Sequence, residues 1–147
     1  MSTLIRGTGS ALPDRVISNA DLEKLVETND EWIVTRTGIR ERRMLAPEEA
    51  TSDIVTRAAQ RALEQAGLAP EDLDLIVVAT CTPDTFTPAT ANHVHRNLCR
   101  GSTIPAFDVN AACSGFVYGL EVVTSMLQSG GCRRALLAGG EGLTRFM

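Results

Sequence analysis

The segment that most constrains the fold of this chain runs from Ile104 to Phe116 and reads IPAFDVNAACSGF. Its first part, residues 104–109, is a short apolar run that predicts a buried strand. Small residues follow, and apolar residues then recur at helical spacing, which predicts a helix from about Cys113 to Ser129. A strand that turns directly into a helix through small residues presents one side chain at the first turn of that helix. Here that side chain is Cys113.

Cys113 is therefore a candidate nucleophile. Unpaired backbone N–H groups and the positive end of the helix dipole lie at such a turn, and both favour a thiolate over a thiol. The expected geometry is that of a nucleophile elbow with sulfur in place of a serine hydroxyl. Two alternatives stay open at this point. Most cysteines are small buried hydrophobic residues, and Ser114 is a rival nucleophile, although no Gly-x-Ser-x-Gly motif surrounds it.

Composition narrows the classes of protein to which the chain can belong. The net charge is −4 and the isoelectric point about 5.2, which argues against nucleic-acid binding. No apolar run approaches the roughly 20 residues that span a bilayer, and the first residues lack the features of a signal peptide. The four cysteines are widely spaced without a Cys-x-x-Cys pair, which argues against a zinc site or a disulfide framework. We therefore expect a cytoplasmic protein with reduced thiols, no metal, and no nucleic-acid or membrane partner.

The order of predicted elements indicates the fold class. Strands are expected at about residues 4–9, 75–79, 104–109 and 134–138, and helices at about 20–27, 30–34, 51–66, 89–98 and 113–129. This order predicts an α/β layered sandwich with a largely parallel sheet. Ligands of such sheets gather beyond the carboxyl ends of the strands, where Thr80, residues 110–113 and residues 139–142 should meet. No repeat or linker is evident, so residues 1–147 are expected to form one domain.

Two weaker motifs are interpreted structurally. Gly7-Thr-Gly9 lacks the third glycine of a dinucleotide-binding loop, and turn chemistry is the better explanation. His93 and His95 are two residues apart on a predicted helix, so they point to different sides and make a poor metal pair. We expect both histidines to be structural.

A basic run in an otherwise acidic chain is the second candidate site. Four arginines lie between Arg36 and Arg43. Such runs are usually solvated surfaces, but arginine also suits phosphate recognition. Trp32, the only tryptophan, lies four residues before Arg36 and shares its helical face. An indole beside a guanidinium suits a nucleotide, whose base stacks on the ring while the cation pairs with phosphate. The alternative for Trp32 is a core or cation–π role.

The motifs together resemble those of a known family. They are Gly7–Ser10, Asn19–Leu22, Asp30–Ile33, Thr35–Arg42, Leu75–Thr80 and Ala106–Phe116, in that order and with family-like spacing. The chain resembles, from about Ile5 to Arg145, the N-terminal half of β-ketoacyl-acyl carrier protein synthase III, a family of the thiolase superfamily. The resemblance implies a thiolase-like fold, of which this chain would be the N-terminal half of a layered αβαβα sandwich with a mostly parallel sheet.

The resemblance also implies an activity, that of an acyltransferase which initiates fatty acid synthesis. Cys113 matches the nucleophile that takes the acyl group from acyl-CoA, usually acetyl-CoA, as a thioester. Malonyl-acyl carrier protein then loses carbon dioxide, and its carbanion attacks the acyl group to give a β-ketoacyl product. This is covalent catalysis that divides one condensation into two steps. Acyl-CoA is a substrate in this reaction, and no cofactor is implied.

Further positions match residues that contact the substrate in the family. Thr28, Trp32 and Arg36 match contacts to the nucleotide end of CoA. Thr87 matches a position that reaches the acyl pocket of the partner subunit in the family's homodimer, and Leu143 matches a residue near the acyl chain.

The chain departs from the family in its length. Family members carry a catalytic histidine and asparagine in a C-terminal half, which has no counterpart here. We expect this chain to be a fragment, a cleavage product or one part of a two-chain protein, inactive and poorly stable alone. The alternatives are a related condensing enzyme of polyketide or 3-hydroxy-3-methylglutaryl chemistry, and a non-catalytic chain that binds CoA or acyl carrier protein.

Overall fold

The computed structural model describes residues 2–146, which form two compact units. The sheet unit consists of the residues up to Ala11 together with Ala50–Gly142, and the hairpin unit consists of Leu12–Glu49 together with the residues from Leu143 onward. The assignment of residues 1–147 to one N-terminal half-domain stays a prediction.

The sheet unit is built on three parallel strands, β3 (Leu75–Ala79), β4 (Ala106–Val109) and β5 (Ala135–Gly139). Their order is β4-β3-β5, so β3 lies at the centre. All five residues of β3 are buried, as its uninterrupted apolar sequence predicts for a strand covered on both faces. The predicted parallel sheet is confirmed. β4 is half-buried rather than buried, because among the described residues it is hydrogen-bonded to β3 alone.

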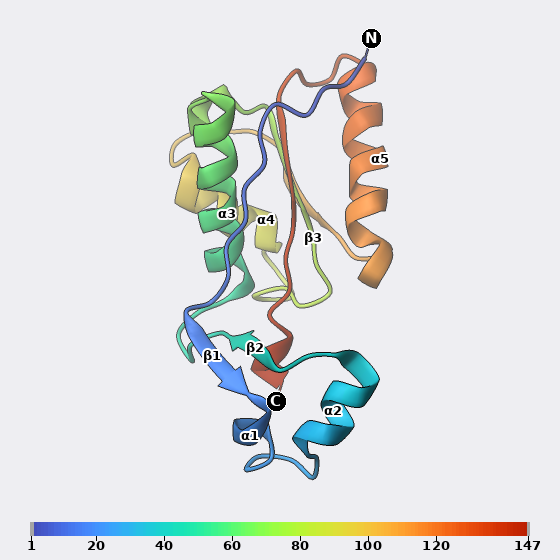
Figure 1. The fold of residues 1–147 in the computed structure, drawn as a ribbon. Coiled ribbons are helices and arrows are strands. Elements are labelled where there is room, and N and C mark those ends of the chain that lie inside the picture. The colour runs from blue at the N-terminus through green and yellow to red at the C-terminus, as the bar shows by residue number, and fades with distance from the viewer. Residues whose placement is uncertain (1, 147) are drawn as a thin grey trace. The chain divides into compact units, whose positions relative to one another are not determined.

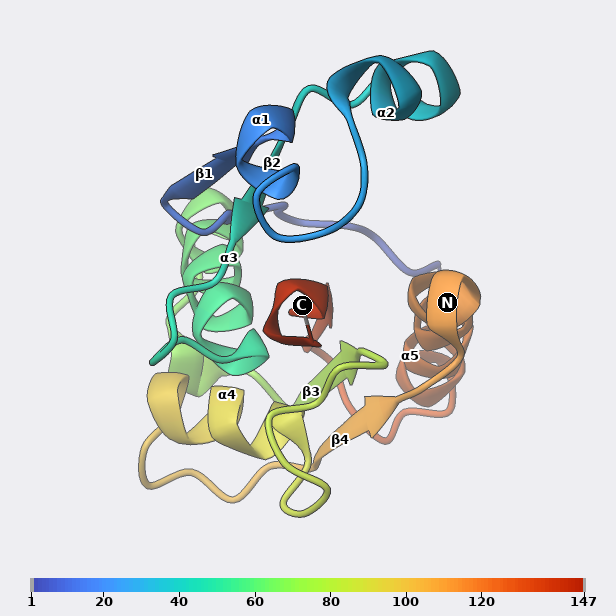
Figure 2. The same ribbon diagram turned by 90° about the horizontal axis from the view of Figure 1, so that it is seen from below.

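Three helices cover the two faces of this sheet (Figures 1 and 2). Helices α3 (Thr51–Ala66) and α4 (Thr90–Leu98) lie on one face, and α5 (Gly115–Gln128) lies on the other. Connection β3-α4-β4 steps to one edge of the sheet, whereas β4-α5-β5 returns past β3 to the other edge. Because crossovers between parallel strands are right-handed, steps in opposite directions place their helices on opposite faces.

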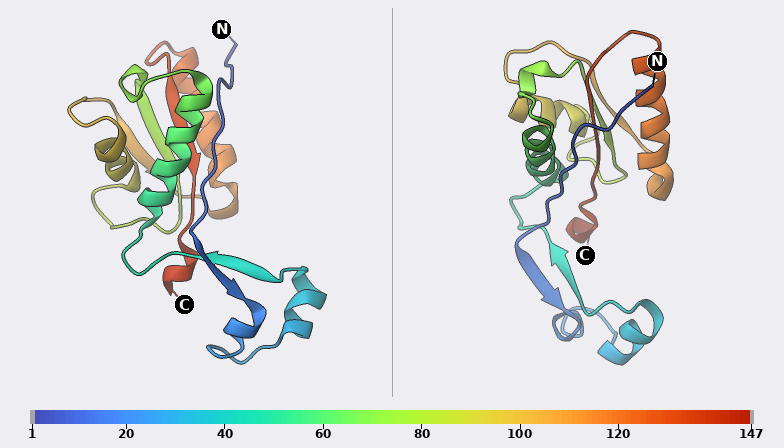
Figure 3. Two further views of the ribbon diagram at one scale, coloured as in Figure 1. Left: turned by 60° about the vertical axis from the view of Figure 1, so that its left-hand side comes forward. Right: turned by 45° about the horizontal axis from the view of Figure 1, so that its top comes forward.

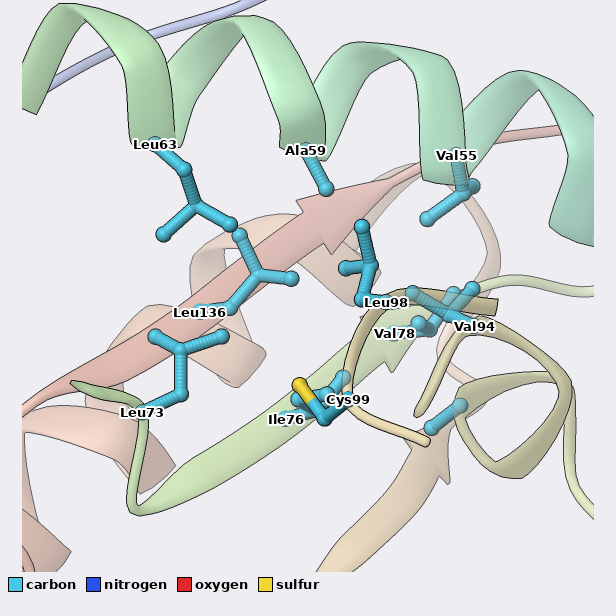
Figure 4. Packing of buried hydrophobic residues seen from close by; sticks show 11 residues of the cluster. Val55, Ala59, Leu63, Leu73, Ile76, Val78, Val94, Leu98, Cys99 and Leu136 are labelled. Carbon is cyan, nitrogen blue, oxygen red and sulfur yellow. The ribbon is translucent and has the colours of Figure 1, made fainter. Parts of the chain in front are cut away.

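Alternate residues of β3 supply two apolar cores. Ile76 and Val78 face α3 and α4, whereas Leu75 and Val77 face α5. Figure 4 shows the first of these clusters, in which Val55, Ala59, Leu63, Val94, Leu98 and Leu136 surround the β3 side chains. Burying each large aliphatic side chain contributes about 1.5–3 kcal/mol, so these two layers are the main source of stability for the unit.

Carboxylates fix the first turns of two helices in the sheet unit. Asp108 on β4 accepts hydrogen bonds from the N–H groups of Thr90 (2.7 Å) and Ala91 (2.8 Å), which open α4. Asp53 accepts the N–H of Ala50 at 2.8 Å and so caps α3. Both contacts satisfy amides that a helix leaves unpaired and place negative charge at the positive end of its dipole.

The segment before α3 differs from the prediction. The structure assigns no strand to residues 4–9, so the strand predicted there is wrong. The segment lies along α3 instead (Figure 3), where the N–H of Thr8 donates to Gln65 Oε1 at 2.6 Å. A Cβ atom on Gly7 or Gly9 would collide with the α3 backbone. These glycines therefore permit close packing on a helix and do not form the turn that the sequence indicates.

The hairpin unit contains β1 (Arg15–Ser18), α1 (Asn19–Leu22), α2 (Asp30–Thr37) and β2 (Glu41–Met44). Strands β1 and β2 pair antiparallel, with Arg15 opposite Met44. Two elements differ from the prediction: this hairpin was not predicted, and α1 ends at Leu22 rather than near residue 27. Helix α2 was predicted, and its cap is confirmed, because Asn29 Oδ1 accepts the N–H of Trp32 at 2.8 Å.

Asn19, predicted to cap α1, occupies a different position. Ser18 caps α1 through a reciprocal bond with Asp21. The Asn19 side chain is only 2% exposed, and its Nδ2 donates to Asp30 Oδ1 (2.7 Å) and to the carbonyl of Ile39 (2.9 Å). Its Oδ1 accepts Arg42 Nη2 at 2.6 Å. Asn19 is thus the polar centre that joins both helices of the unit to the hairpin.

Candidate functional site

The candidate nucleophile lies in the connection between β4 and α5. Cys113 is exposed and belongs to a short 3-10 helix, η2 (Ala112–Ser114), that precedes α5. The predicted start of the helix at Cys113 is therefore two residues early. The N–H groups of Ser114 and Gly115 bond to the carbonyls of Ala111 and Ala112 within this turn, so those two amides are not available to the sulfur.

Backbone strain marks the residue before Cys113. Ala112 has a φ of 45°, in the left-handed region that costs a non-glycine residue about 1–3 kcal/mol. Such strain is concentrated at functional sites, because the surrounding fold must hold it in place. The small side chain of Ala112 limits the cost, so the run of small residues has a conformational reason that periodicity alone could not reveal.

Glycines on α5 bring this turn close to the sheet. A Cβ atom on Gly115 would lie 3.5 Å from the Cβ of Ala79 and 3.8 Å from the carbonyl oxygen of Val109. One turn later, a Cβ atom on Gly119 would lie only 2.9 Å from Leu137 Cδ1. The start of α5 is therefore held against the carboxyl ends of β3 and β4, as predicted for Cys113.

Glu141 organises the same edge of the sheet. Its carboxylate accepts hydrogen bonds from the N–H of Cys81 (2.8 Å) and from the hydroxyls of Thr80 (3.2 Å) and Thr82 (2.5 Å). Thr82 also accepts the N–H of Gly142 at 2.8 Å. The predicted meeting of Thr80 with residues 139–142 is thus confirmed, and the carboxylate that joins the ends of β3 and β5 was missed.

These contacts shift two pKa values. Partial burial alone would raise the pKa of the Glu141 carboxyl, but hydrogen bonds from Thr82, Cys81 and Thr80 together hold it below its ordinary value. A hydrogen bond to this carboxylate raises the pKa of the Cys81 thiol, and burial raises it further. The edge of the sheet therefore combines a carboxylate that stays ionised with a thiol that stays protonated.

The nucleotide-binding candidates lie in the hairpin unit. Trp32 and Arg36 occupy one face of α2, with the guanidinium carbon 4.9 Å from the centre of the indole ring. The indole is 54% exposed, which leaves ring surface free to stack on a planar group. Thr28 lies beside it, and a hollow of about 230 Å³ is lined by Glu27, Thr28, Asn29 and Trp32. The structure thus groups Thr28 with Trp32, and Trp32 with Arg36.

The arginine run divides into two pairs. Arg42 donates to the carbonyl of Ile17 (3.2 Å) and to Asn19, and Arg43 donates to the carbonyls of residues 13 and 14. The hydrogen bonds of these two arginines stabilise the hairpin unit itself. Arg36 and Arg40 are exposed, so the surface available to an anion is smaller than the sequence indicates.

The other two predicted site residues are both exposed. Thr87 lies in the loop between β3 and α4, and Leu143 begins the short helix η3 (Leu143–Phe146). Cys113 and Thr87 belong to the sheet unit, and the remaining four predicted residues belong to the hairpin unit. Their roles stay predictions.

Residues 2–146 contain neither a cluster of metal ligands nor a membrane-spanning helix. No group of three His, Cys, Asp or Glu side chains in this range is placed to hold a metal ion. None of the described helices is both long and apolar enough to cross a bilayer. His93 and His95 lie within hydrogen-bonding distance of hydroxyls, His93 Nε2 at 3.3 Å from Thr85 Oγ1 and His95 Nε2 at 2.7 Å from Ser102 Oγ.

Comparison with known proteins finds relatives of one kind. The model of 3-oxoacyl-[acyl-carrier-protein] synthase III matches residues 107–147, which include the Cys113 turn. The chain is 51% identical over 143 residues to the β-ketoacyl-[acyl-carrier-protein] synthase III of Caldanaerobacter subterraneus subsp. tengcongensis, covering 97% of this chain and 43% of that protein. Along nearly its whole length the chain is thus similar to β-ketoacyl-[acyl-carrier-protein] synthases III, of which it covers less than half.

Solved structures agree with this similarity. The crystal structure of 3-oxoacyl-[acyl-carrier-protein] synthase III from Aquifex aeolicus VF5 matches with a TM-score of 0.90 and 47% identity, covering 98% of this chain and 46% of that one. The priming β-ketosynthase of the R1128 polyketide biosynthetic pathway matches with a TM-score of 0.87 and 37% identity, covering 95% of this chain and 42% of that one. The thiolase-like fold is confirmed, and the chain spans less than half the length of these relatives.

Proposed function

We propose that this chain supplies the nucleophile of a condensing enzyme that starts fatty acid synthesis. The observation that supports the proposal most directly is the exposed Cys113 thiol at a strained turn between β4 and α5, in a chain whose relatives are β-ketoacyl-[acyl-carrier-protein] synthases III. The first substrate is an acyl-CoA such as acetyl-CoA, and the second is malonyl-acyl carrier protein. No cofactor takes part.

The proposed chemistry has two steps. In the first, the Cys113 thiolate attacks the carbonyl of acyl-CoA, the sulfur of CoA leaves, and an acyl-cysteine thioester forms. In the second, malonyl-acyl carrier protein loses carbon dioxide, and the resulting carbanion attacks the acyl-Cys113 carbonyl to release β-ketoacyl-acyl carrier protein. The oxyanions of both steps need hydrogen-bond donors, which are typically worth about 10²–10³ in rate each. We assign these donors to a histidine and an asparagine outside this chain.

The nucleotide end of CoA is proposed to bind on α2. The exposed indole of Trp32 would stack on adenine, and the Arg36 guanidinium, held 4.9 Å from the ring centre, would pair with a phosphate. Thr28 lies in the hollow beside the indole and would donate its hydroxyl. Arg42 and Arg43 are not included, because their guanidinium groups bond to the hairpin.

Thr87 and Leu143 are proposed to contact the acyl chain, Thr87 across the interface of a cytoplasmic homodimer. Both are exposed in the chain, which suits residues that meet a substrate or a second subunit.

The second candidate is a condensing enzyme of polyketide synthesis. It is favoured by the likeness to the R1128 priming β-ketosynthase, whose TM-score of 0.87 is close to that of the fatty acid enzyme from Aquifex. The two candidates share the acyl-Cys113 step and differ in the acyl-CoA and carrier protein used.

The proposal is tested with radiolabelled acetyl-CoA and the protein purified at its natural full length. We expect label on Cys113, and none in Cys113→Ser. The matched control is Ser114→Ala, which removes the neighbouring hydroxyl and should retain the label. Tight CoA binding without transfer would favour a non-catalytic chain, and label on Ser114 would overturn the choice of nucleophile. Competition between acetyl-CoA and longer acyl-CoA substrates distinguishes a condensing enzyme of fatty acid synthesis from one of polyketide synthesis.

A further inference from the structure

A second thiol stands at the same edge of the sheet as Cys113. Cys81 is exposed and follows β3 by two residues, whereas Cys113 follows the neighbouring strand β4 by four. The chain contains two other cysteines, Cys99 and Cys132, and both are buried. Oxidants in solution therefore reach Cys81 and Cys113 more readily than the other two.

The backbone brings these two exposed cysteines together. β3 and β4 pair so that Ala79 lies opposite Val109, and the N–H of Thr80 extends the ladder to the Val109 carbonyl at 3.1 Å. The start of α5 folds back on this point, since a Cβ atom on Gly115 would lie 3.5 Å from Ala79 Cβ. Cys81 is two residues after Ala79, and Cys113 is two residues before Gly115. Each of the two cysteines is thus two residues away from the same close contact between β3 and α5.

The two strands that precede these cysteines are close enough for a covalent bond to join the segments that follow them. Neighbouring strands lie about 4.8 Å apart, within the roughly 4.4–6.8 Å that separates the Cα atoms of disulfide-bonded cysteines. The chain also leaves β3 and β4 toward opposite faces of the sheet, to α4 and α5. Both cysteines are exposed, so a peroxide in solution has access to both sulfur atoms.

The two thiols differ in their surroundings. Cys81 is held by Glu141, whose carboxylate accepts its N–H at 2.8 Å and also hydrogen-bonds to its thiol. This carboxylate, and to a smaller degree Cys113 itself, raises the pKa of the Cys81 thiol. Cys81 is therefore kept as a thiol, whereas Cys113 lies in the short helix η2 that precedes α5. Peroxides react with thiolates, so Cys81, whose pKa is raised, is poorly suited to be the cysteine that the peroxide oxidises first.

We propose that Cys81 and Cys113 are a paired oxidation site, in which Cys81 resolves a sulfenic acid on Cys113 as an intramolecular disulfide. The oxidant is a peroxide. Hydrogen peroxide transfers one oxygen to the Cys113 sulfur, which gives the sulfenic acid and water. The Cys81 sulfur then attacks the Cys113 sulfur, the S–O bond breaks, and the hydroxyl leaves with the Cys81 proton as a second water. A dithiol reductant restores both thiols.

The bond has a consequence for the reaction proposed above. A sulfur held in a disulfide cannot accept an acyl group, and it is also protected from irreversible oxidation to sulfinic or sulfonic acid. This consequence rests on the proposed function, whereas formation of the bond does not. A protein that forms the bond but never accepts acetyl from acetyl-CoA would refute the proposed function and leave this inference intact.

The test is peptide mapping of the full chain after exposure to hydrogen peroxide and alkylation of the remaining thiols. Trypsin leaves Cys81 in residues 62–96 and Cys113 in residues 101–133. We expect these two peptides to be linked in monomeric protein, with the loss of two hydrogen atoms, and to separate after treatment with dithiothreitol. Fragment ions must place the bond on Cys113, because Cys132 lies in the same peptide.

Two variants serve as test and control. Cys81→Ser keeps the N–H that bonds to Glu141 and removes only the second thiol, so Cys113 should pass to sulfinic or sulfonic acid about tenfold more often after the same exposure. Cys132→Ala should keep the linked peptide. Overoxidation of Cys113 to the same extent with and without Cys81 would overturn the proposal, as would a bond to Cys132 or a bond between two molecules. If Cys132→Ala does not fold, the fragment ions of the unmodified sequence decide.

Discussion

The sheet unit and the hairpin unit bury their residues in different ways. In the sheet unit, the five apolar residues of β3 lie between two helical layers and are at most 5% exposed. In the hairpin unit, the apolar cluster is small and consists of Ile17, Leu22 and Ile33 with Met44 at its margin. Its central buried side chain is the polar Asn19. Apolar packing determines the first unit, whereas a polar network determines the second.

This difference has a bearing on the two parts of the candidate site. The turn that carries Cys113 is attached to strands fixed by close packing, which holds a strained residue such as Ala112 in place. The α2 face that carries Trp32 and Arg36 is attached to a unit whose order depends on a few hydrogen bonds. A polar network loses much of its contribution to stability when one member is removed. A single substitution in this network should therefore destabilise the whole hairpin unit.

The largest expected effect is in the core of the sheet unit. Ile76→Ala removes a fully buried side chain and should lower the free energy of unfolding by about 2–5 kcal/mol. Urea unfolding measures the change, and amide exchange locates it in β3 to β5. Ile5→Ala is the matched control, because Ile5 is 76% exposed, and should be close to neutral. If amides of the hairpin unit lost as much protection from exchange as those of β3 to β5, the two units would not be stabilised separately.

The next effect concerns the polar centre of the hairpin unit. Asn19→Ala removes the hydrogen bonds that this side chain makes with Arg42, Asp30 and the carbonyl of Ile39, at a cost of about 2–3 kcal/mol. Amide exchange should increase from β1 to β2 and stay unchanged in β3. Asn92→Ala, at an exposed position of α4, is the control and should behave as the unmodified chain. A neutral Asn19→Ala would mean that the small apolar cluster suffices to hold this unit.

A smaller effect is expected where polar groups support the apolar unit. Asp108→Asn replaces the carboxylate that accepts two N–H groups at the start of α4 with an amide. Loss of the charge and of one acceptor should cost about 1 kcal/mol, measured by urea unfolding against Asp14→Asn at an exposed position. A cost as large as that of Asn19→Ala would show that the sheet unit also depends on its polar contacts.

The same difference explains what the sequence could predict. The buried strand β3, the helices α3 and α5, and Gly67 at the end of α3 follow from side-chain patterns, and the structure confirms these elements. In α5, however, Phe116 and Leu120 of the apolar pattern are 50% and 39% exposed. The hairpin of β1 and β2 has no such pattern. Its strand Glu41–Met44 has the sequence of a charged run, because Arg42 and Arg43 donate hydrogen bonds to backbone carbonyls that are distant in the sequence.

The candidate site was predictable to the same extent. The strand, the turn and the helix around Cys113 could be read from local residues, and so could the shared face of Trp32 and Arg36. The Glu141 network could not, because it joins residues about sixty positions apart through hydroxyl and amide groups. The one available signal was position: Thr80, Cys81 and Glu141 all follow the carboxyl ends of strands, where functional groups of such sheets gather.

The smallest expected effect is the acid response of the hairpin unit. Hydrogen bonds from the Ser18 side chain, then from Lys24 and the Ser18 N–H, lower the pKa of Asp21 from 3.8 to about 2. Because the folded pKa is depressed, Asp21 stabilises the unit fully above about pH 4, and this contribution is lost as the pH falls from about 4 to 2. Asp21→Asn should remove that part of the pH dependence.

The measurement is the difference in unfolding free energy between the two proteins at pH 5 and pH 2.5, followed by amide signals of residues 18–22. The difference should shrink on acidification, because the unmodified chain loses its carboxylate. A difference that does not change with pH would mean that Asp21 caps α1 through the geometry of its hydrogen bonds and not through its charge. The polar contacts of this unit would then resist acid.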